Sequence, residues 1–275
     1  MKESRRAAAV ALPLGIMILL LMIGLLAGMK EAENSGLSIA ERFQQATALP
    51  GKGISADPCP QKPPKPPQYK QYAEAKMIRL LRPQYRGLPV EAAIEQRRSV
   101  REFSTRSIDF AQLSQLVFAA QGTTGERYSH PLRAAPSAGA LYPMELYVVV
   151  NNVEEIPQGI YHYNIREHGL ELLETGDFSA RIIEAGLHQS MLGKANATFA
   201  VSAVFDRTRF KYGERGMRYI YMEAGHISEN IFLQAVSLGL GSVSVGAFYD
   251  DKVNLLFGLD GQKESVIYLH AVGTL

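Results

Sequence analysis

Three arginines and a serine lie within five residues, at Arg97, Arg98, Ser99 and Arg101, in the segment RRSVREF. Guanidinium groups this close repel one another unless an anion or carboxylates lie between them. The planar fork of arginine matches the oxygens of a phosphate, and a serine hydroxyl can donate to the same anion. The segment therefore indicates either a phosphate site or a solvated basic turn.

A second segment consists mostly of small residues and reads RAAPSAGALYP from Arg133 to Pro143. Glycine and alanine allow a backbone to approach a flat ring closely. A tight turn before the apolar run at 146–150 is the simpler interpretation, and it would account for one glycine and one proline.

Two further segments combine glycine with polar or reactive residues. Lys211-Tyr212-Gly213 precedes an apolar stripe that also contains Glu223 and His226, and a surface loop before a helix is its simplest interpretation. Gly239 to Phe248 reads GLGSVSVGAF, which is typical of a strand followed by a glycine-lined turn. Backbone N–H groups in such a turn can stabilise negative charge on a bound ring system.

The four segments, in this order, resemble motifs of the nitroreductase-like superfamily. Arg97 to Phe103 resembles its phosphate and ribityl motif, R-[RH]-S-x-R-x-F, and Gly239 to Phe248 resembles its segment G-L-G-S-x-x-x-G-[GA]-F. Pro136 to Pro143 matches the element P-S-A-G-A-L-Y-P of the SagB-type dehydrogenases, the branch that includes thiazoline and oxazoline oxidases. The resemblance extends from about Leu88 to Gly273 and includes the Lys211-Tyr212 pair.

This resemblance implies an FMN-dependent oxidoreductase that forms a homodimer with shared flavin sites. The implied cofactor-binding residues are Arg97, Arg98, Ser99 and Arg101 for the phosphate and ribityl chain, Arg133, Pro136, Ser137, Ala138, Gly139, Ala140 and Leu141 over the ring from the partner subunit, and Ser244, Gly246 and Ala247 near flavin N5. The implied catalytic pair is Lys211 and Tyr212, which would assist proton transfer while hydride moves between substrate and N5.

Three functions remain open at this point. The first is dehydrogenation of a small-molecule or peptide substrate, for example an azoline-bearing peptide, with oxygen or a membrane quinone as the electron acceptor. The second is reduction of quinones or nitro compounds by NAD(P)H, which is weaker for an exported protein because nicotinamide donors are scarce outside the cell. The third is a non-catalytic, membrane-tethered module that retains the flavin fold.

Composition and missing motifs exclude several other classes. The chain has 275 residues and a formal net charge of +2, so we expect no strongly positive surface for binding nucleic acid. It has a single cysteine, so no intrachain disulfide can form. No H-E-x-x-H, G-x-x-x-x-G-K-[ST] or G-x-S-x-G motif occurs, and the six histidines are scattered. We therefore expect no metal site, no P-loop and no hydrolase nucleophile.

Alternating helices and strands must position these segments. Hydrophobic spacing predicts helices over 88–94, 113–120, 217–235 and 250–257, and strands over 146–150, 160–163, 170–173, 198–205, 242–245 and 266–272. This order predicts an α+β domain, with a nitroreductase-like fold whose mixed central sheet is flanked by helices.

The N-terminal residues indicate a membrane anchor. Ala7 to Gly28 contains no charge and is long enough to span a bilayer, while Lys2, Arg5 and Arg6 precede it. The charges predict a cytoplasmic N-terminus and an exported catalytic domain, and a cleaved signal peptide is the alternative. Six prolines between 58 and 67 predict a semi-rigid spacer. The predicted organisation is an anchor or signal over 1–29, a Pro-rich linker over 30–72 and an FMN-binding domain over 73–275.

Overall fold

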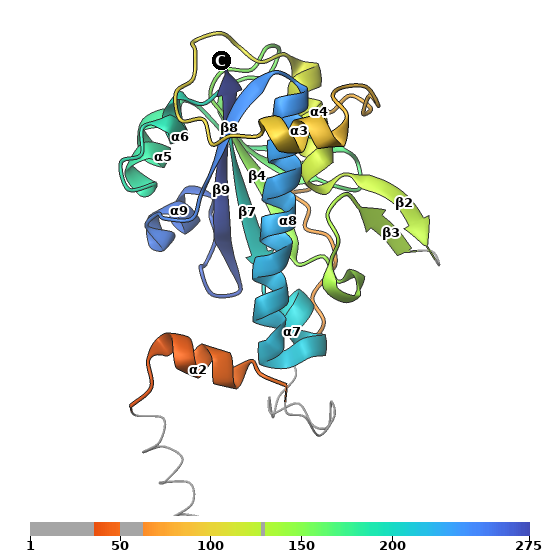
Figure 1. The fold of residues 1–275 in the computed structure, drawn as a ribbon, viewed down its shortest axis with the longest axis vertical. Coiled ribbons are helices and arrows are strands. Elements are labelled where there is room, and N and C mark those ends of the chain that lie inside the picture. The colour runs from red at the N-terminus through yellow and green to blue at the C-terminus, as the bar shows by residue number, and fades with distance from the viewer. Residues whose placement is uncertain (1–35, 50–62, 128–129) are drawn as a thin grey trace, which may run out of the picture. The chain divides into compact units, whose positions relative to one another are not determined.

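A computed structural model describes residues 36–49, 63–127 and 130–275 of the chain (Figure 1). By their contacts the residues form two units, one up to residue 50 and one from residue 51 onward. In the first unit, helix α2 (Ile39–Ala46) begins with a capping box in which Ser38 and Glu41 satisfy each other's backbone N–H groups. None of the residues in α2 is buried.

No helix within these described ranges has the length and apolar character needed to cross a membrane. The predicted span, Ala7 to Gly28, lies outside the described residues. The division of the chain at residues 29 and 72 stays a prediction.

The second unit is built on a seven-stranded sheet with the strand order β1-β6-β5-β4-β7-β9-β8. The strands are β1 (Lys76–Arg79), β4 (Met144–Val150), β5 (Gly159–Asn164), β6 (Gly169–Thr175), β7 (Ala197–Val204), β8 (Leu240–Val245) and β9 (Glu264–Thr274). Every neighbouring pair in this sheet is antiparallel. Parallel pairing within the described residues is limited to two isolated bridges, Ser99–Ser242 and Ile108–Val153. The sheet that was predicted to mix parallel and antiparallel pairs is therefore parallel only at these bridges.

The central strand β4 shows why the sheet is buried on both faces. Its sequence, MELYVVV, is buried at every position. Leu146 and Val148 enter one hydrophobic core, while Tyr147 and Val149 enter the core on the opposite face. Alternating side chains from β-branched and aromatic residues therefore fill two cores from one strand.

Helices cover both faces of this sheet. The helices α4 (Phe110–Gln121) and α8 (Gly216–Ser237) contribute to the first core, and α3 (Val90–Gln96) contacts α8. The second core is covered by α5 (Ser179–Ala185), α6 (Met191–Lys194) and α9 (Asp250–Leu256). A separate hairpin, β2 (Thr123–Arg127) with β3 (His130–Arg133), precedes β4.

The 22-residue helix α8 organises the functional segments, because its length of about 33 Å extends along the sheet. Helix α7 (Asp206–Tyr212) lies at the N-terminal end of α8, and α3 lies at its C-terminal end (Figure 1). A Cβ at Gly216 would lie 3.2 Å from the side chain of Thr208, so the close approach of α7 and α8 depends on a glycine.

The end of the predicted linker is bound to the sheet domain. The backbone carbonyls of Pro67 and Gln68 accept hydrogen bonds from Arg207 at 2.7 Å and Arg133 at 3.4 Å. The backbone N–H of Tyr72 donates to Glu171 at 3.2 Å. Residues 67–72 are therefore held along the domain by side chains that stand far away in the sequence.

Candidate active site

The arginine segment lies beside strand β8. The backbone N–H of Val100 donates to the carbonyl of Ser242 at 2.8 Å, and Ser99 forms a parallel bridge with the same residue. A Cβ at Gly241 would lie 2.8 Å from the side chain of Val100, which explains the glycine at this point of the strand. The segment is therefore fixed to the edge strand of the sheet, as a rigid anion site requires.

The three guanidinium groups differ in their surroundings. Arg97 lies over the ring of Phe232 on α8, 5.0 Å from its centroid. Arg98 donates to the carbonyls of Glu95 and Arg97 at 2.8 and 2.7 Å, and so caps the end of α3. Ser99 and Arg101 are exposed. Arg97, Ser99 and Arg101 are thus the members that best retain donors for a phosphate.

The predicted ring-edge residues lie at the end of the same strand. Gly246 and Ala247 are exposed where the chain leaves β8, and the hydroxyl of Ser244 accepts a hydrogen bond from Tyr268 at 3.0 Å. A Cβ at Gly246 would lie 3.5 Å from the ring of Tyr268. The first and fourth sequence motifs therefore share one strand, and together they form one part of the candidate site.

The second and third motifs meet each other at another place. A Cβ at Gly139 would lie 2.7 Å from the hydroxyl oxygen of Tyr212 and 2.9 Å from Nζ of Lys211. The Nζ of Lys211 lies 5.2 Å from the centroid of the Tyr212 ring. Gly139 has a φ of +63°, which favours glycine at this point of closest approach. The small-residue segment thus packs against the predicted catalytic pair within one chain.

A set of internal contacts closes the loop of residues 136–142. The backbone N–H of Tyr142 donates to Oγ of Ser137 at 2.8 Å, and the backbone N–H of Arg133 donates to the hydroxyl of Tyr142 at 3.2 Å. The Arg133 guanidinium lies 4.6 Å from the centroid of the Tyr142 ring and is buried. The contacts of Arg133 are with the protein beneath the loop, so its implied role at the cofactor stays a prediction.

A buried charged cluster supports this loop from the sheet. Arg207 of α7 forms an ion pair of 2.5 Å with Glu145 of β4. His162 of β5 lies between Glu145 at 3.0 Å and Glu171 at 2.8 Å. The three side chains of the Arg207–Glu145–His162 series are almost entirely inaccessible to solvent. The hydrogen bond from Arg207 to the carbonyl of Tyr142, at 3.4 Å, connects the cluster to the loop.

The electrostatics of this cluster favour its charged forms. Burial opposes charge on Glu145, but the His162 hydrogen bond and the charge of Arg207 hold the pKa of this carboxyl below its ordinary value. Burial likewise opposes charge on His162, but Glu145 and Glu171 raise the pKa of its imidazole above the ordinary value. The sequence provided one signal for this cluster, since glutamate and histidine interrupt otherwise apolar strands.

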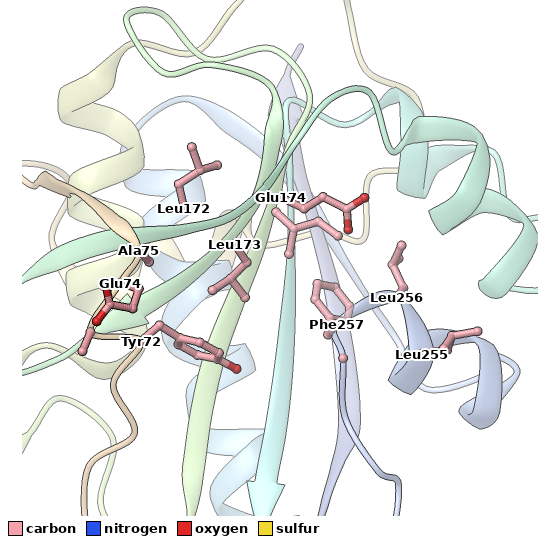
Figure 2. A pocket seen from close by; sticks show the side chains of 12 residues that line it. Tyr72, Glu74, Ala75, Leu172, Leu173, Glu174, Leu255, Leu256 and Phe257 are labelled. Atoms are coloured by element: carbon pink, nitrogen blue, oxygen red, sulfur yellow. The ribbon is translucent and has the colours of Figure 1, made fainter.

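Two pockets of the sheet domain show how the predicted site residues relate to its cavities. One, of about 600 Å³, is lined by Tyr72, Leu172, Phe257 and neighbouring residues (Figure 2), and it contains none of the predicted site residues. A smaller one, of about 140 Å³, is lined by residues of the small-residue loop together with Arg207, His130 and three residues that precede the sheet, namely Gly139, Ala140, Leu141, Lys65, Pro66 and Gln68. No cluster of histidine, cysteine and carboxylate side chains suited to a metal ion occurs in the described part of the chain.

The two parts of the candidate site lie at different levels of α8. The ring of Phe232, over which the Arg97 guanidinium lies, marks the level of the arginine segment on α8. The carboxyl of Glu223, which is close to Ser137, marks the level of the loop and lies nine positions earlier on the helix. Nine residues of α-helix correspond to about 14 Å. Tyr221 and Met222 are exposed on α8 directly before the level of Glu223. One chain therefore presents two separate half-sites along a partly apolar helix face.

Comparisons with known proteins place these features in a family context. The model of the nitroreductase family matches residues 94–274. A nitroreductase-like protein of Methanocaldococcus jannaschii is 37% identical over 191 residues, which cover 70% of this chain and 93% of that protein. The trifolitoxin-processing protein TfxB of Rhizobium leguminosarum is 32% identical over 169 residues, which cover 58% of this chain and 45% of that protein.

Solved structures show a similar fold. The crystal structure of a nitroreductase-like protein from Anabaena variabilis superposes with a TM-score of 0.64 at 27% identity. This similarity covers 73% of the present chain and 42% of that chain. The region matched by the family model, residues 94–274, includes all four motifs.

Proposed function

We propose that this chain, which belongs to the nitroreductase family, is a SagB-type dehydrogenase that moves hydride between a substrate and the N5 of FMN. Family membership makes the chain a flavin-type oxidoreductase. The contact of Gly139 with Lys211 and Tyr212 supports the narrower proposal, because a proton-transfer pair lies against the segment that resembles the ring cover of SagB-type dehydrogenases.

FMN is the cofactor of this family, and the residues present fit it. Arg97, Ser99 and Arg101 offer charged and hydroxyl donors for a phosphate beside β8. At the end of the same strand, Gly246 and Ala247 expose backbone to a flat ring. FMN supplies the two-electron acceptor or donor of the reaction, and the described residues supply its binding surface.

Lys211 and Tyr212 would hold and move the proton of this reaction. Dehydrogenation removes a hydride and a proton from adjacent atoms of the substrate, so a base beside the reacting atoms accelerates it. Lys211 is exposed at the C-terminal end of α7. A substrate that covers Lys211 would exclude water from the site of proton transfer. Tyr212 would fix the amine through its ring and hydroxyl.

The substrate that we propose is a peptide carrying an oxidisable ring such as an azoline. The resemblance of Pro136–Pro143 to azoline oxidases supports it, and so does the similarity to a trifolitoxin-processing protein. The similarity to the Methanocaldococcus protein covers more of the chain and favours a second candidate, a nitro or quinone reductase that uses NAD(P)H.

We further propose a homodimer with shared FMN sites. Nitroreductases are typically homodimers. The arginine segment and the Gly139 loop lie at different levels of α8 within one chain, so a second subunit can bring the loop of one chain to the arginines of the other. Tyr221 and Met222, which are exposed on α8 directly before Glu223, are suited to such an interface.

The sequence also supports a proposal for location. The uncharged run from Ala7 to Gly28 would anchor the chain in a membrane, with the catalytic domain outside the cytoplasm. A membrane quinone would then be within reach as the electron acceptor. A tethered module without activity is the competing proposal, and a purified chain that takes up no FMN would favour it.

Single-turnover reduction of the flavin tests the role of the catalytic pair. Full-length Lys211→Ala and Tyr212→Phe variants, loaded with FMN, are compared with wild type for the rate at which substrate bleaches the flavin absorbance. Lys194→Ala and Tyr85→Phe are matched controls, because both residues are exposed and lie outside the site. We expect each site variant to slow reduction by about 10²-fold or more. Unchanged rates in both site variants would refute the proton-transfer role.

A further inference from the structure

A short segment that precedes the family-matched region crosses the sheet domain beside the candidate site. We call residues 65–72 the strap, and residues 136–142 the small-residue loop. The strap contacts side chains between positions 133 and 264, whereas the model of the nitroreductase family matches only from residue 94 onward. The strap is therefore an addition to the matched region that is nevertheless built into its structure.

Lys70 is the first side chain that anchors the strap. Its Nζ lies 2.7 Å from Oε2 of Glu264 on β9 and donates to the hydroxyl of Tyr147 on β4 at 2.7 Å. The other oxygen of the same carboxylate accepts the hydroxyl of Ser202 at 2.6 Å. The side chains of Lys70 and Glu264 are 27% and 10% exposed, so this ion pair lies largely in the interior and fixes the middle of the strap.

Tyr69 is the second anchor, because its ring contacts guanidinium groups. Those of Arg133 and Arg166 each lie 5.4 Å from the centroid of the Tyr69 ring. Such contacts are favourable, and more so where water is excluded, as it is around the buried Arg133. Tyr69 also packs against the first hydrophobic core. An aromatic ring at residue 69 therefore holds Arg133 from the side of the strap.

Two buried arginines connect the strap to the small-residue loop. Arg207 donates to the carbonyl of Pro67 at 2.7 Å and to the carbonyl of Tyr142 at 3.4 Å. Arg133 donates to the carbonyl of Gln68 at 3.4 Å, and its guanidinium lies 4.6 Å from the centroid of the Tyr142 ring. Each arginine thus binds the strap backbone and contacts the last residue of the loop.

The strap also lines the cavity of about 140 Å³ beside this loop. Lys65, Pro66 and Gln68 line it together with Gly139, which approaches the catalytic pair. The Nζ of Lys65 lies 5.7 Å from the centroid of the Phe210 ring on α7, the helix that ends in the catalytic pair. The strap therefore reaches from the interior of the sheet domain to the reactive end of the candidate site.

The small-residue loop needs support from outside because its backbone is strained. Gly139, Ala140 and Tyr142 have φ angles of +63°, +52° and +47°. Only glycine adopts this region readily, so Ala140 and Tyr142 remain there only where surrounding contacts hold them. The contacts of the two arginines with Tyr142 are of this kind.

We propose that the strap is a positioning element of the active site. It holds Arg133 and Arg207 against Tyr142, and thereby keeps the small-residue loop against the catalytic pair. Its consequence for catalysis rests on the proposed function, whereas its effect on the loop does not. Detachment of the strap would remove an acceptor from each arginine, and the strained residues of the loop would then relax.

Lys70 provides the sharpest test, because it lies away from the loop. No hydrogen bond, ion pair or ring contact joins Lys70 to the loop or to either arginine among the described residues. An effect of Lys70 on the loop must therefore pass along the strap. The double variant Lys70→Met/Glu264→Gln removes the anchor without leaving an unpaired charge in the interior, so the domain should still fold.

Hydrogen exchange of single amides in the flavin-free full chain measures the hold on the loop. The reporter is the backbone N–H of Tyr142, which donates to Oγ of Ser137. We expect Tyr69→Leu and Lys70→Met/Glu264→Gln each to lower its protection by about tenfold. Amides of β4 report global unfolding, and their protection should fall by less than that of Tyr142.

Three control variants separate positioning from simple packing. Tyr69→Phe keeps the ring beside the guanidinium groups, so it should retain the wild-type protection that Tyr69→Leu loses. Phe178→Leu alters another ring that lies under a guanidinium, that of Arg181 at 5.1 Å, but in the second core. Lys252→Met/Glu184→Gln removes an exposed ion pair of 2.6 Å. The last two should leave the Tyr142 amide unchanged.

Unchanged protection of the Tyr142 amide in Lys70→Met/Glu264→Gln would overturn the proposal. A loss at Tyr142 no greater than the loss in β4, or equal losses in Tyr69→Phe and Tyr69→Leu, would also overturn it. The measurement needs no bound FMN, so a failure of the proposed function would be recorded separately, as a chain that takes up no flavin.

Discussion

Replacement of Glu223 by glutamine should change how the stability of the whole chain depends on pH. The folded-state pKa of the Glu223 carboxyl is about 7, whereas its ordinary value is 4.5. Below pH 4.5 the carboxyl is protonated in both states, and the folded chain has the full benefit of a neutral buried group. As the pH rises from 4.5 to 7, the unfolded chain ionises first, so the free energy of unfolding falls.

The size of this effect follows from the shift. A difference of 2.5 units between folded and unfolded pKa values corresponds to about 3 kcal/mol, because one unit corresponds to about 1.4 kcal/mol. Glutamine does not titrate and removes this contribution. The free energy of unfolding of wild type, minus that of Glu223→Gln, should therefore fall by about 3 kcal/mol between pH 4.5 and 7 and then level off.

Urea unfolding at a series of pH values measures this difference. Far-UV circular dichroism is the suitable probe, because the chain contains no tryptophan. Other titrating groups, such as His162 and Glu145, are present in both proteins and cancel in the difference. A difference that stays constant within about 0.5 kcal/mol from pH 4.5 to 7.5 would refute the conclusion that Glu223 is buried as a neutral acid.

Three further predictions concern the site and its support. Arg207→Met should lower the free energy of unfolding by about 3 kcal/mol or more in urea titrations, because Glu145 loses an ion-pair partner in the interior. Gly139→Ala should lower flavin reduction in stopped-flow absorbance by at least about tenfold, because the new Cβ would lie 2.7 Å from the Tyr212 hydroxyl at a φ of +63°. Arg97→Ala should weaken FMN binding by about tenfold or more in a fluorescence titration, with exposed Arg79→Ala as control.

The sequence predicted the elements that are long or strongly periodic. The apolar stripe at 217–235 corresponds to α8, and the runs at 146–150 and 198–205 correspond to β4 and β7. It did not indicate α5, α6 or α7, which have seven, four and seven residues and show little helical period. The helices α3 and α9 are equally short but were predicted, α3 because Pro89 directly precedes its first turn. Strand β1 was missed for the same reason, since its four residues carry little alternation.

The candidate site was predictable where each motif is continuous in the sequence. The placement of Gly139 against Lys211 could not be read from spacing, because it depends on the turn into α7 and on left-handed residues in the loop. The cluster of Glu145, His162 and Arg207 was not predicted either. These residues lie on separate elements, and only the antiparallel register of the sheet brings them together.

The visible absorption spectrum of the purified full-length chain, with identification of any pigment that heat releases, tests the central claim most directly. A yellow protein that releases FMN, and whose Arg97→Ala variant is depleted of it, is the predicted result. A folded but colourless protein that takes up no added FMN would contradict the assignment as an FMN-dependent oxidoreductase.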